Sequence, residues 1–281
     1  MIIIDNNSAL LQLAEELRDK KVAFVPTMGN LHAGHLSLVD VAKAHAQVVI
    51  VSIFVNPIQF GENEDFDQYP RTLGADSYAL CNKNVDYLYT PAQHDLFPST
   101  TDAVKVSLPG LASILCGEFR PGHFDGVSTI LLKLFNLVKP DIVVMGEKDY
   151  QQLILVRAMI KELFLPVQLV SAPTVREKDG LAMSSRNRYL NAAERVVAPE
   201  LYRVLLHVRE QVNEGEVSYR RLEERAMYEL SESGFRPEYV SLRNSHTLAV
   251  ADKHEKDLVV LAAAWLGETR LIDNVIFTKG H

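Results

Sequence analysis

Short apolar runs alternate with longer helical patterns through the first part of this 281-residue chain. The runs are rich in β-branched residues and cover residues 22–25, 48–54, 87–89, 142–145 and 167–170. Between them, apolar residues recur at helical spacing over 37–46, 73–80, 127–138 and 150–163. Runs that are apolar on both faces, such as 48–54, are typical of central parallel strands covered by helices on either side. The alternation predicts an α/β fold with a doubly wound, Rossmann-like parallel sheet.

The pattern changes after residue 176. Helical spacing over 194–214 and 219–233 is followed by three apolar runs, 239–242, 258–264 and 271–277. Helices followed by consecutive strands indicate a small α+β unit with an antiparallel sheet. We therefore expect two domains, a Rossmann-like domain over 1–176 and a smaller α+β domain over 177–281.

Composition excludes several classes of function. An apolar fraction of 47% supports a sizeable core, and the two cysteines, Cys81 and Cys116, form no CxxC pair and fit a reducing compartment. No apolar stretch is long enough to span a bilayer. A net charge of −7 argues against a nucleic-acid partner, which normally requires a broad basic surface. We expect a cytoplasmic protein without nucleic-acid or membrane partners, whose anionic ligands are held by a few local cations. Candidates for these cations are Arg120, Lys148, Arg186 and Arg188.

Polar or glycine-containing segments follow four of the predicted strands, at residues 27–35, 56–61, 146–149 and 174–176. Ligands of parallel α/β sheets bind beyond the carboxyl ends of the strands, so we expect one site built from all four segments. Two of them also permit a plainer interpretation. Residues 56–61 would then be a surface loop, and 146–149 a glycine turn with solvated charges.

The sequence His-Ala-Gly-His at residues 32–35 lies between a predicted strand and a predicted helix. Such a turn directs backbone N–H groups and the positive end of the helix dipole at one point, which suits a phosphate. His32 and His35 lie on one side of the first turn, so both can donate hydrogen bonds to the same group. The alternatives are ordinary helix-start residues or half of a zinc site, although no further Cys or His follows at a suitable spacing.

Met183-Ser184-Ser185-Arg186 offers two hydroxyls and a guanidinium that can close over an anion. The two serines alone would be interpreted as helix caps or turn residues. The donors that follow them in an acidic chain favour anion binding instead. The segment 116–124 is either a mobile cover or a simple connector.

Five segments together resemble the pantothenate synthetase family, the pantoate–β-alanine ligases. They are PTMGNLHAGH (26–35), FVNPIQFG (54–61), YPRT (69–72), GEKDYQQ (146–152) and MSSRN (183–187), in the family's order and spacing. The family belongs to the nucleotidylyl-transferases marked by HIGH and KMSKS motifs. From that wider group the chain departs at Ala182, in place of the first lysine, and at Ser185-Arg186, in place of the final Lys-Ser. Asn30 also stands where we expect alanine.

The resemblance implies ATP-dependent condensation of (R)-pantoate with β-alanine to pantothenate, through a pantoyl-adenylate intermediate and with release of AMP and pyrophosphate. Mg²⁺ is expected with ATP, held mainly by phosphate oxygens, so no protein ligand to metal is named. The domain over 1–176 is expected to bind nucleotide and pantoate, and the domain over 177–281 to close over the ATP. A homodimer is also implied.

The resemblance assigns roles to individual residues. Catalytic roles fall to His32, His35, Lys148 and Arg186. The residues expected to bind ATP are Met28, His32, Gly34, His35, Gly146, Lys148, Asp149, Val175, Met183, Ser184, Ser185 and Arg186. Those expected to contact pantoate or β-alanine are Pro26, Thr27, Asn56, Gln59, Arg120 and Gln152.

Other functions remain compatible with the residues. A nucleotidylyltransferase acting on a phosphorylated metabolite would share the His-Ala-Gly-His turn but form no amide. A nucleotide-sensing module would bind ATP without turnover. An aminoacyl-tRNA synthetase is disfavoured, because an acidic chain with a small second unit leaves little surface to bind tRNA.

Overall fold

A computed structural model describes residues 1–62, 64–98 and 104–280 of the chain. The chain divides into two compact units. Unit 1 contains Met1–Glu147 and Leu155–Pro173, and unit 2 contains Lys148–Ile154 and the chain from Thr174 onward. The short segment Lys148–Ile154 therefore belongs with the C-terminal part of the chain, although its sequence neighbours on both sides belong to unit 1.

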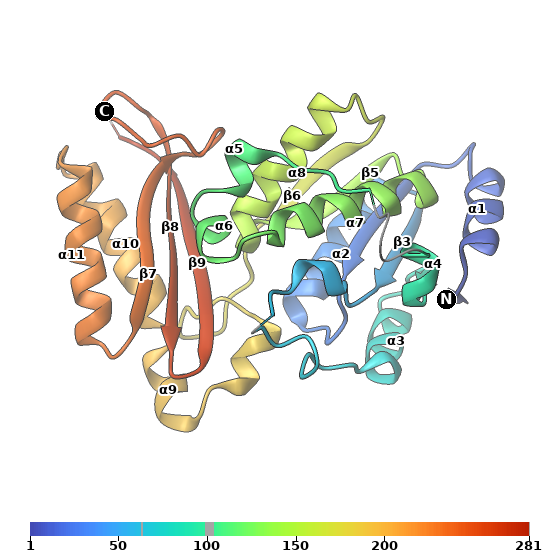
Figure 1. Ribbon diagram of the computed structural model, residues 1–281, viewed down its shortest axis with the longest axis horizontal. Coiled ribbons are helices and arrows are strands. Elements are labelled where there is room, and N and C mark those ends of the chain that lie inside the picture. Colours follow the sequence, from blue (N-terminus) through green and yellow to red (C-terminus); the bar gives the residue numbers. More distant parts are fainter. Residues whose placement is uncertain (63, 99–103, 281) are drawn as a thin grey trace. The chain divides into compact units, whose positions relative to one another are not determined.

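Unit 1 is built on a six-stranded parallel sheet in the order β1-β4-β3-β2-β5-β6 (Figure 1). The strands are β1 (Ile2–Ile4), β2 (Val22–Thr27), β3 (Val48–Ile53), β4 (Tyr87–Tyr89), β5 (Ile142–Gly146) and β6 (Gln168–Ala172). This topology and the small sheet of unit 2 confirm the predicted fold class.

The helices of unit 1 cover both faces of the sheet. The longer ones are α1 (Asn7–Glu16), α2 (Ala33–His45), α3 (Leu73–Asn82), α7 (His123–Val138) and α8 (Tyr150–Glu162), which begins within unit 2. Short helices are η1 (Pro57–Gln59), α4 (Gln93–Leu96), α5 (Pro109–Ala112) and α6 (Cys116–Phe119). The short helix η2 (Glu147–Asp149) begins in unit 1 and continues into unit 2. Val25 packs with Leu38 and Val39 of α2, whereas the preceding Phe24 meets Phe135 of α7 edge-on at 6.5 Å. Successive residues of a strand point to opposite faces, which explains why the central strands are apolar throughout.

Unit 2 is an antiparallel sheet of three strands, β7 (Arg236–Asn244), β8 (Asp257–Leu266) and β9 (Thr269–Thr278), packed against two helices (Figure 1). The helices α10 (Glu200–Asn213) and α11 (Tyr219–Glu232) follow η3 (Ser185–Tyr189) and α9 (Ala192–Val197). Leu201, Val204, Leu205 and Val208 form the apolar stripe of α10, at the spacing that places one face of a helix against a core.

Several element boundaries differ from the sequence prediction. The helix predicted over 37–46 begins at Ala33, because His32 and His35 together cap its N-terminus. The single helix predicted over 194–214 is two helices, α9 and α10, because Pro199 has no N–H to donate within a continuous helix. Helix α1 was not predicted; Asn6 caps it by accepting from the Ala9 N–H at 2.9 Å.

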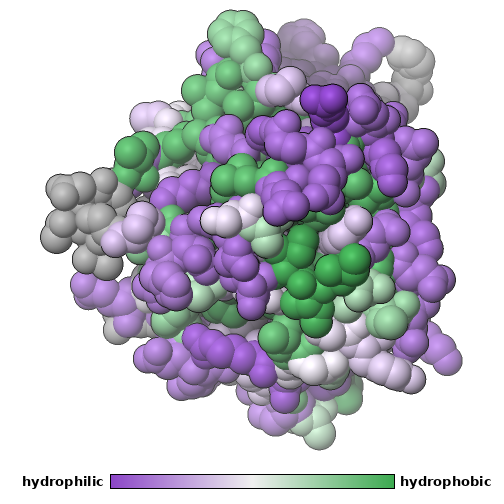
Figure 2. All heavy atoms as spheres, turned by 90° about the vertical axis from the view of Figure 1, so that its right-hand side faces the viewer, coloured by the Kyte–Doolittle hydropathy of each residue, from purple (hydrophilic) through white to green (hydrophobic). Residues whose placement is uncertain are grey.

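Within the described residues, no helix combines the length and apolarity needed to cross a membrane. Figure 2 shows the side of the molecule on which α1 and β1 lie, where hydrophobic side chains appear among hydrophilic ones. Ile2 and Ile3 of β1 are 60% and 55% exposed.

Candidate active site

The two histidines of the predicted phosphate site lie against each other at the start of α2. Their ring centroids are 4.1 Å apart. The Nδ1 atom of His32 accepts from the Gly34 N–H at 3.1 Å, and Nδ1 of His35 accepts from the His32 N–H at 3.3 Å. A neutral imidazole that accepts through Nδ1 carries its proton on Nε2. The backbone contacts of both rings therefore place the N–H group of each on its Nε2 atom.

The loop before these histidines is held by a buried carboxylate that the sequence analysis missed. Asp76 of α3 is 3% exposed and accepts from the N–H groups of Asn30 and Leu31 at 2.9 and 2.8 Å. Thr72 donates to the same carboxylate at 3.0 Å. Gly29 and Asn30 both have positive φ angles, 81° and 51°. Asparagine tolerates this conformation better than alanine, which explains the departure at position 30.

Residues predicted to bind pantoate come together beside β2 and β3. The Asn56 amide donates to Gln59 Oε1 at 2.9 Å and to the Gly126 carbonyl at 3.2 Å, and Gln59 donates to the Met28 sulfur at 3.1 Å. Asn56 is 1% exposed, and its Oδ1 atom has no hydrogen-bond partner among the described residues. A buried acceptor without a partner is costly, so this amide is suited to receive a donor from a ligand.

Gly126 allows α7 to approach the Gln59 loop closely. A Cβ atom at this position would lie 2.4 Å from the Ile58 carbonyl oxygen and 2.7 Å from Gln59 Cα. Those distances are far shorter than a van der Waals contact. The absence of a side chain at Gly126 therefore sets the position of η1.

The segment 116–124 fixes the same loop. Arg120 forms a two-point ion pair with Glu64, at 2.6 and 2.5 Å, and also donates to the Gln59 carbonyl at 3.4 Å. The Nδ1 atom of His123 lies 2.8 Å from that carbonyl. Burial alone would raise the pKa of Glu64, but the hydrogen bond and charge of Arg120 outweigh it and hold this pKa below its usual value. Arg120 is thus engaged with the loop that carries Gln59.

In unit 2, the segment at the start of α8 is tied to the C-terminal sheet. The Asn274 amide donates to the Lys148 carbonyl at 3.0 Å, and the Tyr150 hydroxyl donates to the Ser245 carbonyl at 2.8 Å. The Lys148 ammonium lies 3.8 Å from the Asp149 carboxylate.

The Met183–Arg186 segment is also part of unit 2, where it pairs with the segment that follows β6. The Met183 N–H donates to the Val175 carbonyl at 3.0 Å. Ser184 caps η3 by accepting from the Arg186 N–H at 3.3 Å, which is the plainer role considered for this serine. Capping uses only one lone pair of the hydroxyl and keeps its donor.

Comparison with known proteins shows the family to which the chain belongs. The model of the family described as pantoate-beta-alanine ligase matches residues 2–276. The chain belongs to this ligase family. A pantothenate synthetase from Ectopseudomonas mendocina is 51% identical over 258 residues, which cover 92% of this chain and 90% of the relative. That from Neisseria meningitidis serogroup B is 52% identical over 255 residues, with coverage of 91% and 92%.

Solved structures of pantoate–β-alanine ligases match the whole fold. One is the pantothenate synthetase of Thermus thermophilus, with a TM-score of 0.92 at 40% identity over 98% of this chain and 99% of that one. The ligase from Francisella tularensis, described as a complex with beta-gamma ATP and beta-alanine, has a TM-score of 0.83 at 35% identity, with coverage of 98% and 97%.

The predicted site residues of this ligase are divided between the two units. Unit 1 holds Pro26, Thr27, Met28, His32, Gly34, His35, Asn56, Gln59, Arg120 and Gly146. Unit 2 holds Lys148, Asp149, Gln152, Val175, Met183, Ser184, Ser185 and Arg186. Within unit 1 the structure brings His32 to His35, and Gln59 to both Met28 and Asn56. Within unit 2 it pairs Val175 with Met183.

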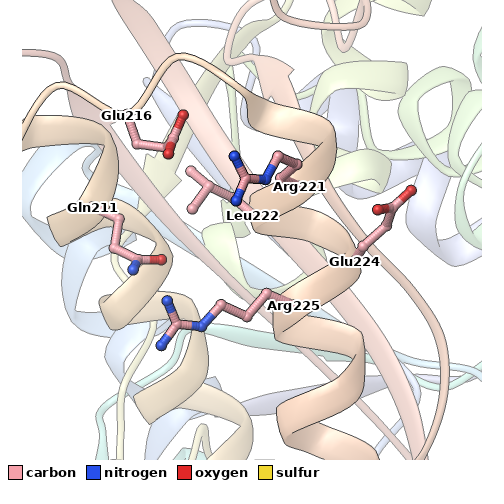
Figure 3. A pocket seen from close by; sticks show the side chains of 6 residues that line it. All are labelled: Gln211, Glu216, Arg221, Leu222, Glu224 and Arg225. Atoms are coloured by element: carbon pink, nitrogen blue, oxygen red, sulfur yellow. The ribbon is translucent and has the colours of Figure 1, made fainter.

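One cavity of the ligase lies apart from these residues. A cavity of about 370 Å³ opens between α10 and α11, and Figure 3 shows Arg221 and Arg225 of α11 pointing toward Glu216 and Gln211. Arginines and glutamates both line this cavity, so its charge favours no particular ligand. Among the described residues, no three His, Cys, Asp or Glu side chains are grouped as a metal site would require.

Proposed function

We propose that the chain condenses (R)-pantoate with β-alanine in two steps that consume ATP. In the first step a carboxylate oxygen of pantoate attacks the α-phosphorus of ATP, and the bond to the pyrophosphate oxygen breaks. In the second step the amine of β-alanine attacks the carbonyl carbon of pantoyl adenylate, AMP leaves with the bridging oxygen, and the nitrogen loses a proton. Family membership and the ligands named for the Francisella ligase support this reaction.

The observation that carries the proposal is the paired N–H donors of His32 and His35. Because Nδ1 of each ring accepts from the backbone, both rings present Nε2–H without needing a positive charge. Charge that develops on phosphate oxygens during adenylation is stabilised best by donors already fixed in place. Gly34, between the two histidines, leaves room for the triphosphate to approach the helix.

Further residues of unit 1 are proposed to bind pantoate. The unpartnered Oδ1 of Asn56 accepts from a pantoate hydroxyl, and Gln59 donates to its carboxylate. Pro26 and Thr27 form the wall at the end of β2, and Arg120 contributes through the Gln59 loop. Gln152 is the pantoate contact proposed from the start of α8.

The proposed ATP contacts involve both units. Met28 and Gly146 of unit 1 border the nucleotide. In unit 2, Lys148, Ser184, Ser185 and Arg186 neutralise phosphates. The remaining nucleotide contacts are Asp149, Val175 and Met183. Mg²⁺ enters as the complex with ATP and takes its ligands from phosphate oxygens and water, because this ion usually keeps several waters when it binds substrate phosphates.

A change of His35 to alanine tests the proposal. We expect pantoate-dependent exchange between ATP and pyrophosphate to fall at least about 100-fold, the usual effect of a lost transition-state donor. The matched control is His45→Ala, in the last turn of the same helix and exposed, which we expect to keep exchange within about twofold of the unchanged protein. Exchange at the original rate in His35→Ala would remove this histidine from the chemistry.

Product analysis separates this reaction from the other functions considered. The unchanged protein, given ATP, Mg²⁺, pantoate and β-alanine, should release AMP and pantothenate in equal amounts. Transfer of AMP without amide formation would indicate a nucleotidylyltransferase, and ATP binding without products would indicate a sensor.

We also propose a cytoplasmic homodimer. Neither Cys81 nor Cys116 forms a disulfide bond, as is usual in a reducing compartment. Exposed apolar side chains of unit 1, including Ile2, Ile3 and Val104, are available for burial between subunits.

A further inference from the structure

Strand β9 carries two adjacent buried polar residues, Asp273 and Asn274, which are 4% and 5% exposed. They pair across the sheet with Ala262 and Leu261 of β8. Polar side chains in such an apolar sheet destabilise the fold unless each has a hydrogen-bond partner. The partners of these two residues lie in the segments that the proposed function assigns to ATP.

Asn274 reaches the backbone at Lys148. Its Nδ2 atom donates to the Lys148 carbonyl at 3.0 Å. This carbonyl lies in η2, where the chain turns from β5 into α8. A fixed backbone at this point restricts the positions from which the Lys148 ammonium can reach a phosphate.

Asp273 holds a second segment through an arginine. Arg176 donates to the two carboxylate oxygens of Asp273 at 2.6 and 2.9 Å, and to the carbonyls of Gly180 and Asn274 at 3.1 and 3.3 Å. The Arg176 guanidinium also lies 3.5 Å from the centre of the Tyr202 ring. Burial raises the pKa of Asp273, while the charges of Arg176 and Lys148 oppose that effect.

The arginine fixes the start of the serine-containing segment. Arg176 and Ala182 form an antiparallel bridge, which closes a turn, and Met183 pairs with Val175 directly beyond it. Strand β9 itself packs against η3, the helix that contains Ser185 and Arg186. One pair of neighbouring residues therefore contacts the backbone at Lys148 directly and, through Arg176, the turn that leads into the Met183–Arg186 segment.

We propose that Asp273 and Asn274 are positioning residues for ATP, Asn274 through Lys148 and Asp273 through Arg176 and the Met183–Arg186 segment. Neither residue touches the reacting atoms. The inference rests on the proposed role of these two segments in binding phosphates, and it goes further by assigning the alignment of both to a single strand of the C-terminal sheet.

A double-mutant cycle on ATP binding tests the role of Asn274. Calorimetry with Mg²⁺ and a non-hydrolysable ATP analogue should show a roughly 10-fold higher Kd for Asn274→Ala than for the unchanged protein. In a Lys148→Ala background, the same change should raise the Kd less than about twofold, because the side chain that Asn274 aligns is already gone. A purely structural residue would instead weaken binding of the analogue whether or not Lys148 is present.

A second buried ion pair on the same sheet provides the control for Asp273. Arg270 of β9 donates to Glu238 of β7 at 2.6 and 3.0 Å. The two side chains of this pair are 13% and 12% exposed, compared with 18% for Arg176 and 3% for Asp273. Asp273→Asn and Glu238→Gln should both lower the melting temperature, since each weakens a buried ion pair. Only Asp273→Asn should raise the KM for ATP, by roughly 5-fold or more, while the KM for β-alanine stays within about twofold.

The outcomes separate this inference from the proposed function. If Lys148→Ala binds the analogue as tightly as the unchanged protein, the phosphate assignment fails and the inference fails with it. The other case is that Lys148→Ala weakens binding of the analogue as expected. If Asn274→Ala then raises the Kd by the same factor in the unchanged protein and in Lys148→Ala, the inference alone is overturned. Equal effects of Asp273→Asn and Glu238→Gln on the KM for ATP would overturn the role of Asp273. If Asp273→Asn does not fold, Arg176→Lys replaces it as the test variant. This change keeps the positive charge but loses the two-point contact with Asp273, and it should raise the KM for ATP in the same way.

Discussion

In unit 1, the hydrogen bonds that polar side chains form with the protein determine which of their atoms can donate to a ligand or accept from it. The Nδ1 atoms of His32 and His35 are occupied by backbone N–H groups, and the Asn56 amide is occupied by Gln59 and Gly126. These contacts place the proton of each imidazole on Nε2, and they leave the buried Oδ1 atom of Asn56 as an acceptor. Such fixed polarity is what distinguishes a prepared site from a group of polar residues on a surface.

Replacement of Gln59 or Gln152 by alanine should weaken the binding of pantoate more than the binding of ATP. An amide left without its partner penalises only the ligand that it contacts, by about 1–3 kcal/mol, so we expect the KM for pantoate to rise roughly 10-fold or more and the KM for ATP less than about threefold. Steady-state kinetics with each substrate varied in turn measures both. Gln12→Ala, on the exposed side of α1, is the control. An equal rise in both constants would argue against the pantoate assignment.

The sequence predicted the pairing of His32 with His35 but not the role of Asp76. Adjacency of His32 and His35 follows from helical spacing alone, because residues three apart share a face. Asp76 could not be found this way, since a single carboxylate in the first turn of a helix is an ordinary helix-start residue. Its contacts are 45 and 46 residues away along the chain and depend on the packing of α3 against the loop.

At the scale of elements, Asp76 of α3 holds the loop before α2 in place through two backbone hydrogen bonds. Replacement of Asp76 by alanine leaves two buried backbone N–H groups without acceptors, at a cost of about 2–4 kcal/mol in the free energy of unfolding. The freed loop should also weaken ATP binding, because His32 and His35 follow it directly.

Urea unfolding and calorimetry with the ATP analogue measure the two effects of Asp76→Ala. The matched control is Asp40→Ala on α2, which removes an exposed ion pair with Lys83 and should cost less than about 1 kcal/mol. Unchanged stability in Asp76→Ala would mean that the loop holds its conformation without the carboxylate.

Elements whose apolar residues recur at a regular spacing were predicted well. Elements that depend on contacts between distant parts of the chain were not. The strand 87–89 and the starts of α3, α8 and α11 match their predicted positions because apolar spacing changes sharply there. The helix predicted over 194–214 is divided at Pro199, although apolar residues recur at helical spacing on both sides of this proline. The close approach of α7 to the Gln59 loop depends on Gly126, whose importance appears only when α7 and η1 are seen together.

For the whole molecule, the expected assembly is a dimer. Size-exclusion chromatography with light scattering should give twice the chain mass of 31.5 kDa, independent of protein concentration over the micromolar range. Burial of apolar surface from unit 1 would favour such an assembly. A mass of one chain at all concentrations would contradict it, and a mass that rises with concentration would show weak association only.

The chain passes between the two units more than once, since Lys148–Ile154 belongs with the residues from Thr174 onward. This has a consequence for recombination between homologous genes. A single crossover near codon 174 would join Lys148 from one parent to Asn274 from the other, and so combine two contacting residues that were not selected together. Hybrids that also exchange codons 148–154 would inherit both partners from one parent, and they should tolerate greater divergence between the parents.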